Sequence, residues 1–302
     1  EAIAITGSSG KTTLKELLAH SLNKIASTTC SKKSFNNKYG VPLSLFNIKR
    51  KNLFGVFEVG MDRKGEIDYL TKLINPNVGV ITNISYAHIK NFKSLKEIAT
   101  AKGEIINNII EGGTIILNKD DKYFNFFKNI ALKDKLKIIK FSKKNNANIK
   151  FIKIVKKRKN YFLFLSINNI SKKFIINKKL KNYVFHILAA TAVISNFVDI
   201  ININKNIFYD FKIPKGRGDI KKIKVKNKSI NIIDESYNSN PLSLEFAINN
   251  FDKIEASLDR KYILLGDMLE LGKFSKKLHR DVAKILNKSK VNKIFVYGKY
   301  IK

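Results

Sequence analysis

The residues best suited to chemistry stand near the start of the chain, in the glycine-rich stretch ITGSSGKTT. Gly7 and Gly10 let the backbone turn its N–H groups toward an anion, and Lys11 adds a mobile positive charge. Thr12 offers a hydroxyl group to Mg²⁺. The stretch predicts a polyphosphate site in a shortened form of the general P-loop, which would need glycine where Ile5 stands. The predicted phosphate-binding residues are Gly7, Ser8, Ser9, Gly10, Lys11, Thr12 and Thr13.

The residues on either side of this turn predict how it is positioned. Ala2–Ile5 is an apolar run typical of a buried strand, and after Lys11 the leucines recur on one face at helical spacing. A strand, a tight turn and a helix in this order place the anion at a helix N-terminus, where the backbone is electropositive. The chain begins inside the strand and without Met, and a later strand ends it. We therefore expect a fragment that lacks a preceding domain and the end of its last domain.

Polar side chains follow two further predicted strands, LFGVFEVG and NVGVITNIS, between which GEIDYLTKLI is helical. Glu58 follows the first strand, Thr82 and Asn83 follow the second, and His88 lies in the loop beyond. Ligands of parallel sheets bind at the carboxyl ends of strands, so Thr12, Glu58 and His88 are predicted to converge on one metal ion. Each side chain taken alone also fits an ordinary role, a surface carboxylate for Glu58 and a loop hydrogen bond for His88.

A lysine interrupts the buried side of the next predicted helix, SLKEIATAKGEIINNII. Leu95, Ile98, Ala99, Ile105, Ile106 and Ile109 recur at helical spacing, and Lys102 falls among them. A lysine on the core side of a helix extends its amine to solvent, pairs with an acid or loses its charge. A neutral, desolvated lysine is a nucleophile that can take up CO₂ as a carbamate, which would offer oxygen ligands to Mg²⁺.

The composition is strongly basic, with 58 Lys and Arg against 24 Asp and Glu and a formal net charge of +34. The lysines accompany Asn and Ile along the whole chain instead of forming one patch, which favours a compositional bias with solvated lysine faces over a nucleic-acid surface. No apolar run reaches the ~18 residues of a membrane span, and no signal-peptide pattern is present. Cys30 is the single cysteine, so the chain has no internal disulfide or cysteine metal site, in keeping with a reducing cytoplasm.

The remaining segments predict two domains of the α/β class. From residue 118 to 183 three alternating segments, IKFIKIV, YFLFLSI and KKFIINK, predict an antiparallel meander, and the helical YVFHILAATAVISNF follows. IPKGRGD reads as a linker, after which SINIIDESYNSNP, KYILLGDMLELG and NKIFVYG each contain a strand. We predict a P-loop domain over 1–213, with a mostly parallel sheet and a small meander. A truncated Rossmann-like α/β domain over 214–302 follows.

Six motifs in this order resemble the Mur ligases: ITGSSGKTT, SFNNKYGVPLSL, FEVGMDRKGEIDYL, NVGVITNISYAHIKNFKSLKEIATAKGEI, IIDESYNSNPLSL and LLGDMLELG. The resemblance runs from Ile3 to about Gly298 and is weak in the middle. It implies that ATP phosphorylates a substrate carboxylate and that an amine then attacks the acyl phosphate, releasing phosphate. GDMLELG and DESYNSNP resemble the members that add D-alanyl-D-alanine to UDP-N-acetylmuramoyl-tripeptide in peptidoglycan synthesis.

The resemblance also implies roles for single residues. The metal ligands would be Thr12, Glu58, His88 and a carbamylated Lys102, and the catalytic set would be Lys11, Lys102, His88 and Glu58. The substrate would meet Asn36, Asn37, Thr82 and Asn83. ATP would meet the P-loop, His186, Arg217, Glu235, Asn238 and Asn240, and the family motifs also include Tyr237, Ser239, Asp267, Glu270 and Gly272.

Three departures from the family pattern affect these roles. The loop before His88 carries Ser85 and Tyr86 where Gly and Pro are usual. Asn182 and His186 exchange the usual types, so His186 either bonds adenine or is a core histidine. Glu235 replaces an aspartate and would reach the ribose from one methylene further out.

Two other functions remain open at this point. One is another amide ligase of this architecture, such as a different Mur enzyme or a folylpolyglutamate synthase. The other is a basic P-loop ATPase that binds nucleic acid, which clustered lysines with interleaved aromatic residues would favour. The ligase that adds D-alanyl-D-alanine would need ATP and Mg²⁺ as cofactors. It would be a cytoplasmic monomer that binds no nucleic acid and has no membrane span.

Overall fold

The computed structural model describes residues 1–158, 160–226, 228–254 and 260–301. The chain forms two compact units, the first made of Glu1–Ile84 and Lys96–Lys212 and the second of Ser85–Leu95 and Ile213–Lys302. The strands of the first unit are β1 (Ala2–Thr6), β2 (Thr28–Cys30), β3 (Phe54–Glu58), β4 (Val78–Ile81), β5 (Thr114–Asn118), β6 (Lys137–Ser142), β7 (Ile149–Lys157), β8 (Asn160–Ile167) and β9 (Ile170–Ile176). Its α-helices are α1 (Lys11–Leu22), α2 (Gly40–Phe46), α3 (Glu66–Ile74), α4 (Leu95–Gly103), α5 (Phe124–Lys133) and α6 (Val184–Ile194).

One sheet runs through the first unit, in the order β2-β3-β1-β4-β5-β6-β7-β8-β9. Its strands pair in parallel from β2 to β7, and β7, β8 and β9 then pair antiparallel. The predicted meander is therefore an extension of the main sheet. The fold class predicted from the sequence, a mostly parallel α/β sheet with a small antiparallel part, is confirmed.

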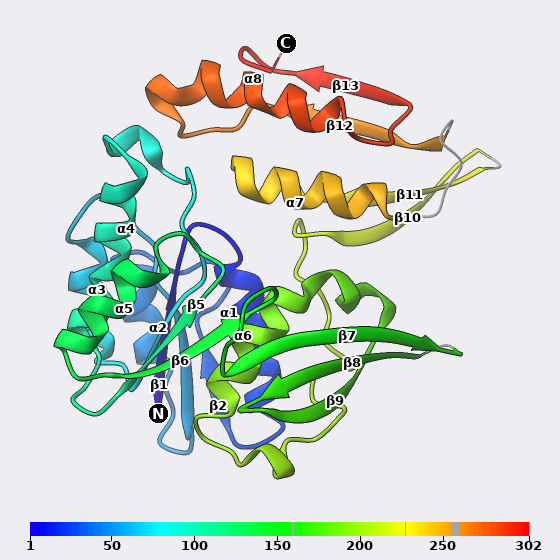
Figure 1. Ribbon diagram of the computed structural model, residues 1–302. Coiled ribbons are helices and arrows are strands. Elements are labelled where there is room, and N and C mark those ends of the chain that lie inside the picture. Colours follow the sequence, from blue (N-terminus) through cyan, green and yellow to red (C-terminus); the bar gives the residue numbers. More distant parts are fainter. Residues whose placement is uncertain (159, 227, 255–259, 302) are drawn as a thin grey trace. The chain divides into compact units, whose positions relative to one another are not determined.

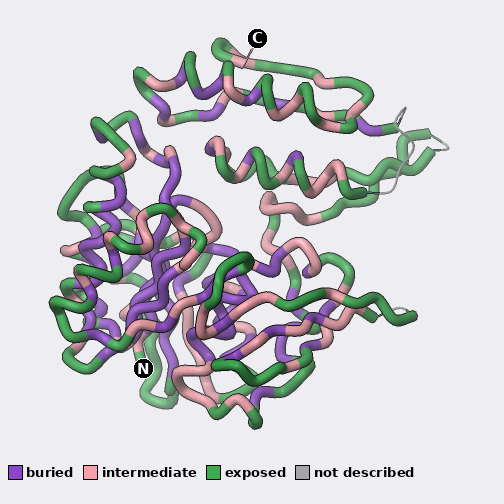
Figure 2. The backbone as a smooth tube through the Cα atoms, viewed as in Figure 1, coloured by how far each residue is buried: buried purple, intermediate pink, exposed green. Residues whose placement is uncertain are grey.

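The core of the first unit is the central strands and the helix faces packed against them. Ile3, Ala4 and Ile5 of β1 have no exposed surface, and the same holds for the four leucines Leu14, Leu17, Leu18 and Leu22 of α1. Figure 1 shows α1 and α6 over one face of the sheet and α3, α4 and α5 over the other, and Figure 2 shows the central strands as the most buried part of this unit. This burial fixes the carboxyl ends of β1, β3 and β4, which carry the predicted site.

The second unit combines a loop from the middle of the chain with the C-terminal segment. It contains the 3₁₀ turn η1 (Ile89–Asn91), the hairpin β10 (Asp219–Val225) and β11 (Lys228–Asp234), the helices α7 (Pro241–Asp252) and α8 (Ser275–Leu286), and the parallel pair β12 (Tyr262–Gly266) and β13 (Lys293–Tyr297). The 3₁₀ turn η6 (Gly272–Phe274) precedes α8. The strand β12, the helix α8 and the strand β13 form a βαβ unit, as expected for an α/β domain.

Two local predictions need correction. The helix that carries Lys102 ends at Gly103, and the short 3₁₀ turn η2 (Ile106–Asn108) follows. Ile105, Ile106 and Ile109 are buried, as expected, but they lie in and around this turn and not on a helix face. The strand β10 was not predicted, because its Lys-rich sequence DIKKIKV has mostly exposed side chains and carries little apolar signal.

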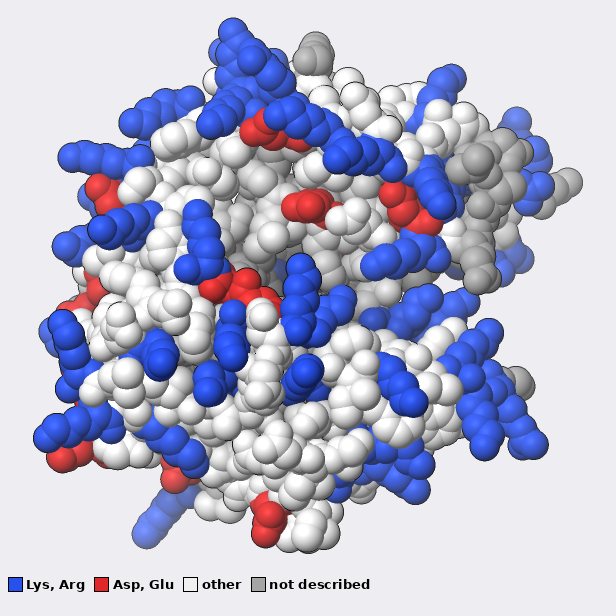
Figure 3. Space-filling view, viewed as in Figure 1, with Lys and Arg blue, Asp and Glu red and all other residues white. Residues whose placement is uncertain are grey.

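None of the helices in the described ranges is long and apolar enough to cross a membrane. On the face drawn in Figure 3, Lys and Arg side chains are scattered widely and do not gather in one patch.

Candidate functional site

The P-loop is shaped by two glycines that no other residue could replace without strain. Gly7 has a φ of 141° and Gly10 a φ of 82°, both in the region that L side chains rarely adopt. A Cβ atom on Gly7 would lie 1.8 Å from Thr82 Oγ1, and one on Gly10 would lie 2.8 Å from His186 Nε2. These close approaches place Thr82 and His186 directly against the loop.

Residues after β4 hold the P-loop from the neighbouring strand. Asn83 accepts the backbone N–H of Ser9 with Oδ1 at 3.0 Å and that of Ser8 with its carbonyl oxygen at 2.8 Å. Thr82 Oγ1 donates to the Ser9 carbonyl at 2.7 Å. Lys11 Nζ donates to the Gly7 carbonyl at 2.9 Å and so folds back over the loop. Thr82 and Asn83, predicted to face the substrate, thus form hydrogen bonds with the P-loop.

A buried carboxylate stands beside the first turn of α1. Glu58 is 1% exposed, and its Oε2 accepts a hydrogen bond from Thr12 Oγ1 at 2.6 Å while its Oε1 accepts one from Asn36 Nδ2 at 2.8 Å. Ser34 Oγ lies 3.3 Å from the same Thr12 hydroxyl. Carboxylate and hydroxyl oxygens are the donors that Mg²⁺ prefers, so this group fits the predicted ion.

Asn37, another predicted substrate residue, lies just before α2. Its Oδ1 accepts the backbone N–H groups of Tyr39 at 3.1 Å and of Gly40 at 2.9 Å. The SFNN segment therefore has one asparagine that orients Glu58 and one that fixes the following helix.

Lys102 is 1% exposed, which excludes the possibility that its amine extends into solvent. No hydrogen bond or ion pair of this amine is found among the residues that the structure describes. Burial lowers the pKa of Lys102 well below its usual value, and the positive charge of Lys11 lowers it further. The neutral amine considered from the sequence is the form that this environment favours.

His186 lies on α6 and is 8% exposed, among the rings of Tyr183 and Phe185. It contacts the P-loop at Gly10 as described above. The structure thus brings it to the phosphate-binding turn, and its contact with adenine stays a prediction.

In the second unit, Arg217, Tyr237 and Glu235 lie near one another at the end of the β10–β11 hairpin. The Arg217 guanidinium carbon is 4.1 Å from the centre of the Tyr237 ring. Loss of solvent raises the pKa of Glu235 to about 7, although part of its side chain stays exposed, and the charge of Arg217 acts in the opposite direction.

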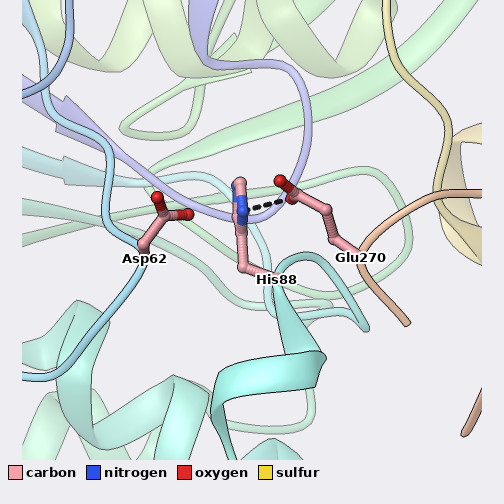
Figure 4. A group of neighbouring side chains, drawn as sticks. All are labelled: Asp62, His88 and Glu270. Carbon is pink, nitrogen blue, oxygen red and sulfur yellow. Dashed lines mark ion pairs between the residues drawn. The ribbon is translucent and has the colours of Figure 1, made fainter. Parts of the chain in front are cut away.

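A small pocket in the second unit brings other predicted residues together. It is lined by Tyr86, Ala87, His88, Asn238, Ser239, Asn240, Leu269 and Glu270. Asn240 caps α7, since its Oδ1 accepts the Ser243 N–H at 3.0 Å. His88 Nδ1 lies 2.5 Å from Glu270 Oε2, the ion pair shown in Figure 4, which also labels Asp62 of the first unit. His88 belongs to the second unit, so its convergence with Glu58 and Thr12 stays a prediction.

Sequence reasoning missed three residues that these contacts single out. Lys15 is fully buried on α1, and Ser34 meets the Thr12 hydroxyl. His279 is buried on α8 and bonded to the loop that carries Glu270. Lys15 had the same signal as Lys102, a lysine among the buried positions of a helix. A single serine in a polar segment and a histidine in a charged helix carry no such signal.

Comparisons with known proteins agree with this arrangement of motifs. Residues 5–194 match the Mur ligase middle domain, and residues 217–300 match the domain described as Mur ligase, glutamate ligase domain. The chain therefore belongs to the Mur ligase family.

Particular members of the family match almost the whole chain. The UDP-N-acetylmuramoyl-tripeptide–D-alanyl-D-alanine ligase of Buchnera aphidicola is 33% identical over 302 residues, 99% of this chain and 64% of its own length. The enzyme of the same name from Rickettsia prowazekii is 32% identical over 99% of this chain and 66% of its own length. The MurF crystal structure from Acinetobacter baumannii superposes with a TM-score of 0.88 at 28% identity, over 99% of this chain and 64% of that one. The chain thus spans about two thirds of the length of these relatives.

Proposed function

We propose that this chain is the ATP-binding and C-terminal part of a ligase that joins D-alanyl-D-alanine to UDP-N-acetylmuramoyl-tripeptide. The observation that carries the proposal is a P-loop whose first helical turn bonds to a buried glutamate, within a chain similar to such ligases over 99% of its length. The first unit would be the central domain and the second the C-terminal ligase domain. The product would be a cytoplasmic precursor of peptidoglycan, and we expect a monomer.

The proposed reaction has two balanced steps. A carboxylate oxygen of the tripeptide attacks the γ-phosphorus of ATP, and the bond to the β,γ-bridging oxygen breaks to release ADP. The amine of D-alanyl-D-alanine then attacks the acyl carbon, loses a proton and expels phosphate. Positioning and charge stabilisation supply most of the catalysis in phosphoryl transfer.

The residues that would bind phosphate, metal and tripeptide have distinct roles in this proposal. Lys11 and the N–H groups at the start of α1 bind the phosphates, and Gly7 and Gly10 admit them close to the backbone. Thr12, Glu58, His88 and carbamylated Lys102 would hold Mg²⁺, which when bound offsets charge on the transferred phosphoryl group. Asn36 orients the Glu58 carboxylate, while Asn37, Thr82 and Asn83 shape the segments that would face the tripeptide.

Lys102 would become a ligand by reaction with CO₂. Its neutral amine forms the N–C bond and releases a proton to solvent, leaving a carbamate with two oxygens. The lowered pKa of the buried amine supports this step.

The second unit would supply the other side of the nucleotide site. Arg217, supported by the Tyr237 ring, would bind phosphate oxygens, and Glu235 would accept a ribose hydroxyl group. Asn238 and Asn240, together with His186 of the first unit, would complete the ATP contacts.

The test is phosphate release by the full-length protein with ATP, Mg²⁺, UDP-muramoyl tripeptide and D-alanyl-D-alanine, each omitted in turn. We expect release to require both substrates. Replacing the dipeptide by L-alanine, D-glutamate or a diamino acid distinguishes other Mur-type ligases, and replacing the tripeptide by a folate distinguishes a folylpolyglutamate synthase. Release that ignores the dipeptide, or that nucleic acid stimulates, would overturn the proposal.

A further inference from the structure

His279 on α8 is a fully buried histidine whose two ring nitrogens are both engaged. Nε2 is 2.9 Å from the backbone nitrogen of Met268, and Nδ1 is 2.7 Å from the carbonyl oxygen of Ser275. A backbone N–H can only donate and a carbonyl can only accept. Both bonds therefore require the neutral ring with its proton on Nδ1.

The bond to Met268 fixes the start of the loop from Asp267 to Gly272. Met268 is 2% exposed and Leu271 is 1% exposed, so the loop is anchored by apolar side chains as well. Between them Glu270 has a φ of 62°, in the left-handed region that residues other than glycine seldom adopt. Such a conformation persists where neighbouring contacts determine it.

The contacts at Glu270 come from the loop that carries His88. The Glu270 carbonyl accepts the backbone N–H of Lys90 at 3.0 Å, and its carboxylate forms the ion pair with His88 described above. His88 also has a positive φ, 58°. Glu270 and His88, both in a disfavoured backbone conformation, thus contact one another. His279 holds Met268, at the start of the loop that carries Glu270.

The same histidine contacts the end of β13. Asp267 accepts the backbone N–H groups of Lys299 at 2.7 Å, Tyr300 at 3.0 Å and Ile301 at 2.9 Å. The Tyr300 ring stacks on His279 with centroids 5.6 Å apart. The Asp267 carboxylate also lies close to the ring, with Oδ1 3.7 Å from Nε2.

We propose that His279 is a positioning residue, whose neutral imidazole holds the Met268 N–H and thereby the backbone that presents Glu270 to His88. The effect on ligase turnover rests on the proposed function, whereas the effect on the loop does not. Without the imidazole, the buried N–H of Met268 loses its acceptor, and the strained turn at Glu270 loses one of the contacts that hold it.

The test compares three variants of the full-length protein. In His279→Gln the side-chain oxygen can still accept the Met268 N–H, and in His279→Leu nothing can. Val282→Ala, at a buried position of the same helix, is the control for lost stability without lost loop contacts. Hydrogen exchange at the Met268 amide reports the loop, and phosphate release reports turnover.

We expect the Met268 amide hydrogen to exchange about tenfold faster or more in His279→Leu than in the parent protein. In His279→Gln and Val282→Ala the exchange rate should stay near that of the parent. Turnover of His279→Leu should fall by about tenfold with the KM for ATP changed less than about twofold, and His279→Gln should recover most of it. Unchanged exchange in His279→Leu, or equally fast exchange in Val282→Ala, would overturn the proposal. Exchange is measured without substrates, so failure of the proposed function leaves this result readable.

Ring nitrogen chemical shifts of ¹⁵N-labelled protein give an independent answer. At neutral pH we expect a protonated Nδ1 and an unprotonated Nε2. A doubly protonated ring, or a proton on Nε2, would be incompatible with the bond from Met268 and would contradict the assignment.

Discussion

Two lysines of the first unit are buried, and their surroundings differ sharply. Lys15 has no exposed surface, and its ammonium donates to the carbonyls of Ser31 and Lys33 and pairs with Glu16 at 2.8 Å. Lys102 is 1% exposed and has no acceptor or acid partner among the described residues. The charged group that lowers the pKa of Lys102 further is Lys11, which has the same sign.

The comparison shows that burial alone does not decide what a lysine does. Acceptors and an acid make a buried lysine a structural tie, here between α1 and the segment leading to Ser34 and Asn36. A buried amine with no such partners loses its proton more easily and becomes a nucleophile. The predictions below test this difference, starting with the largest effect.

The largest effect is expected at Lys102. Lys102→Ala should lower phosphate release by about 10²-fold or more, since a ligand of the reaction's charged centre is lost. Lys102→Arg should be as inactive, because a guanidinium cannot form a carbamate. Lys96→Ala, an exposed lysine on the same helix, should change little.

Labelling separates the two possible roles of Lys102. With ¹³C-bicarbonate the parent protein should show a carbamate carbon resonance that Lys102→Ala lacks. An active Lys102→Arg variant without that resonance would show that the residue acts as a cation, and the contrast with Lys15 would be lost.

Lys15 should matter for stability. Lys15→Met leaves two buried carbonyls without their donor and Glu16 without its counter-ion, so we expect a loss of about 2–4 kcal/mol in the free energy of unfolding. Lys24→Met, which removes a more exposed ion pair with Asp210, should cost about 0–1 kcal/mol. Urea unfolding midpoints measure both, and equal losses would show that the buried contacts of Lys15 add nothing.

The elements that could be predicted from the sequence are those marked by a periodic residue pattern or a motif. An element that buries one face repeats apolar residues at a regular spacing. This spacing predicted the strand before Gly7, the leucine face of α1 and the antiparallel meander. Lys102 was found because a lysine in an apolar stripe is an anomaly. Its helix was drawn too long because buried isoleucines in a 3₁₀ turn mimic the spacing of a helix face.

Contacts between distant segments could not be predicted in the same way. Three contacts depend on which segments meet in the folded chain: Asn83 with the P-loop, Glu270 with His88, and His279 with Met268. Single polar residues in loops carry no periodic signal. The meeting of loops is a property of the folded chain. The family motifs include Asn83, His88 and Glu270 but not His279.

The charge of Lys11 should have a smaller effect, on the pKa of Lys102. Burial is the larger cause of the low pKa of Lys102, and Lys11 the smaller. In Lys11→Met the pKa of Lys102 should rise and a carbamate there would lose a favourable neighbour, so the carbamate resonance should need higher pH to appear. A midpoint unchanged within error would mean that burial alone sets the reactivity of Lys102.

The smallest effect reports the charge on Lys15 through Cys30, the single cysteine of the chain. Burial raises the pKa of the Cys30 thiol, Glu16 raises it further, and Lys15 lowers it. Lys15→Met should therefore raise this pKa and Glu16→Gln should lower it, because a thiolate gains from a nearby cation and loses from a nearby anion. The rate of alkylation against pH measures both shifts on one thiol. If Lys15→Met leaves the profile unchanged while Glu16→Gln moves it, the charge of Lys15 does not act on the Cys30 thiol, and the electrostatic part of the contrast with Lys102 is lost.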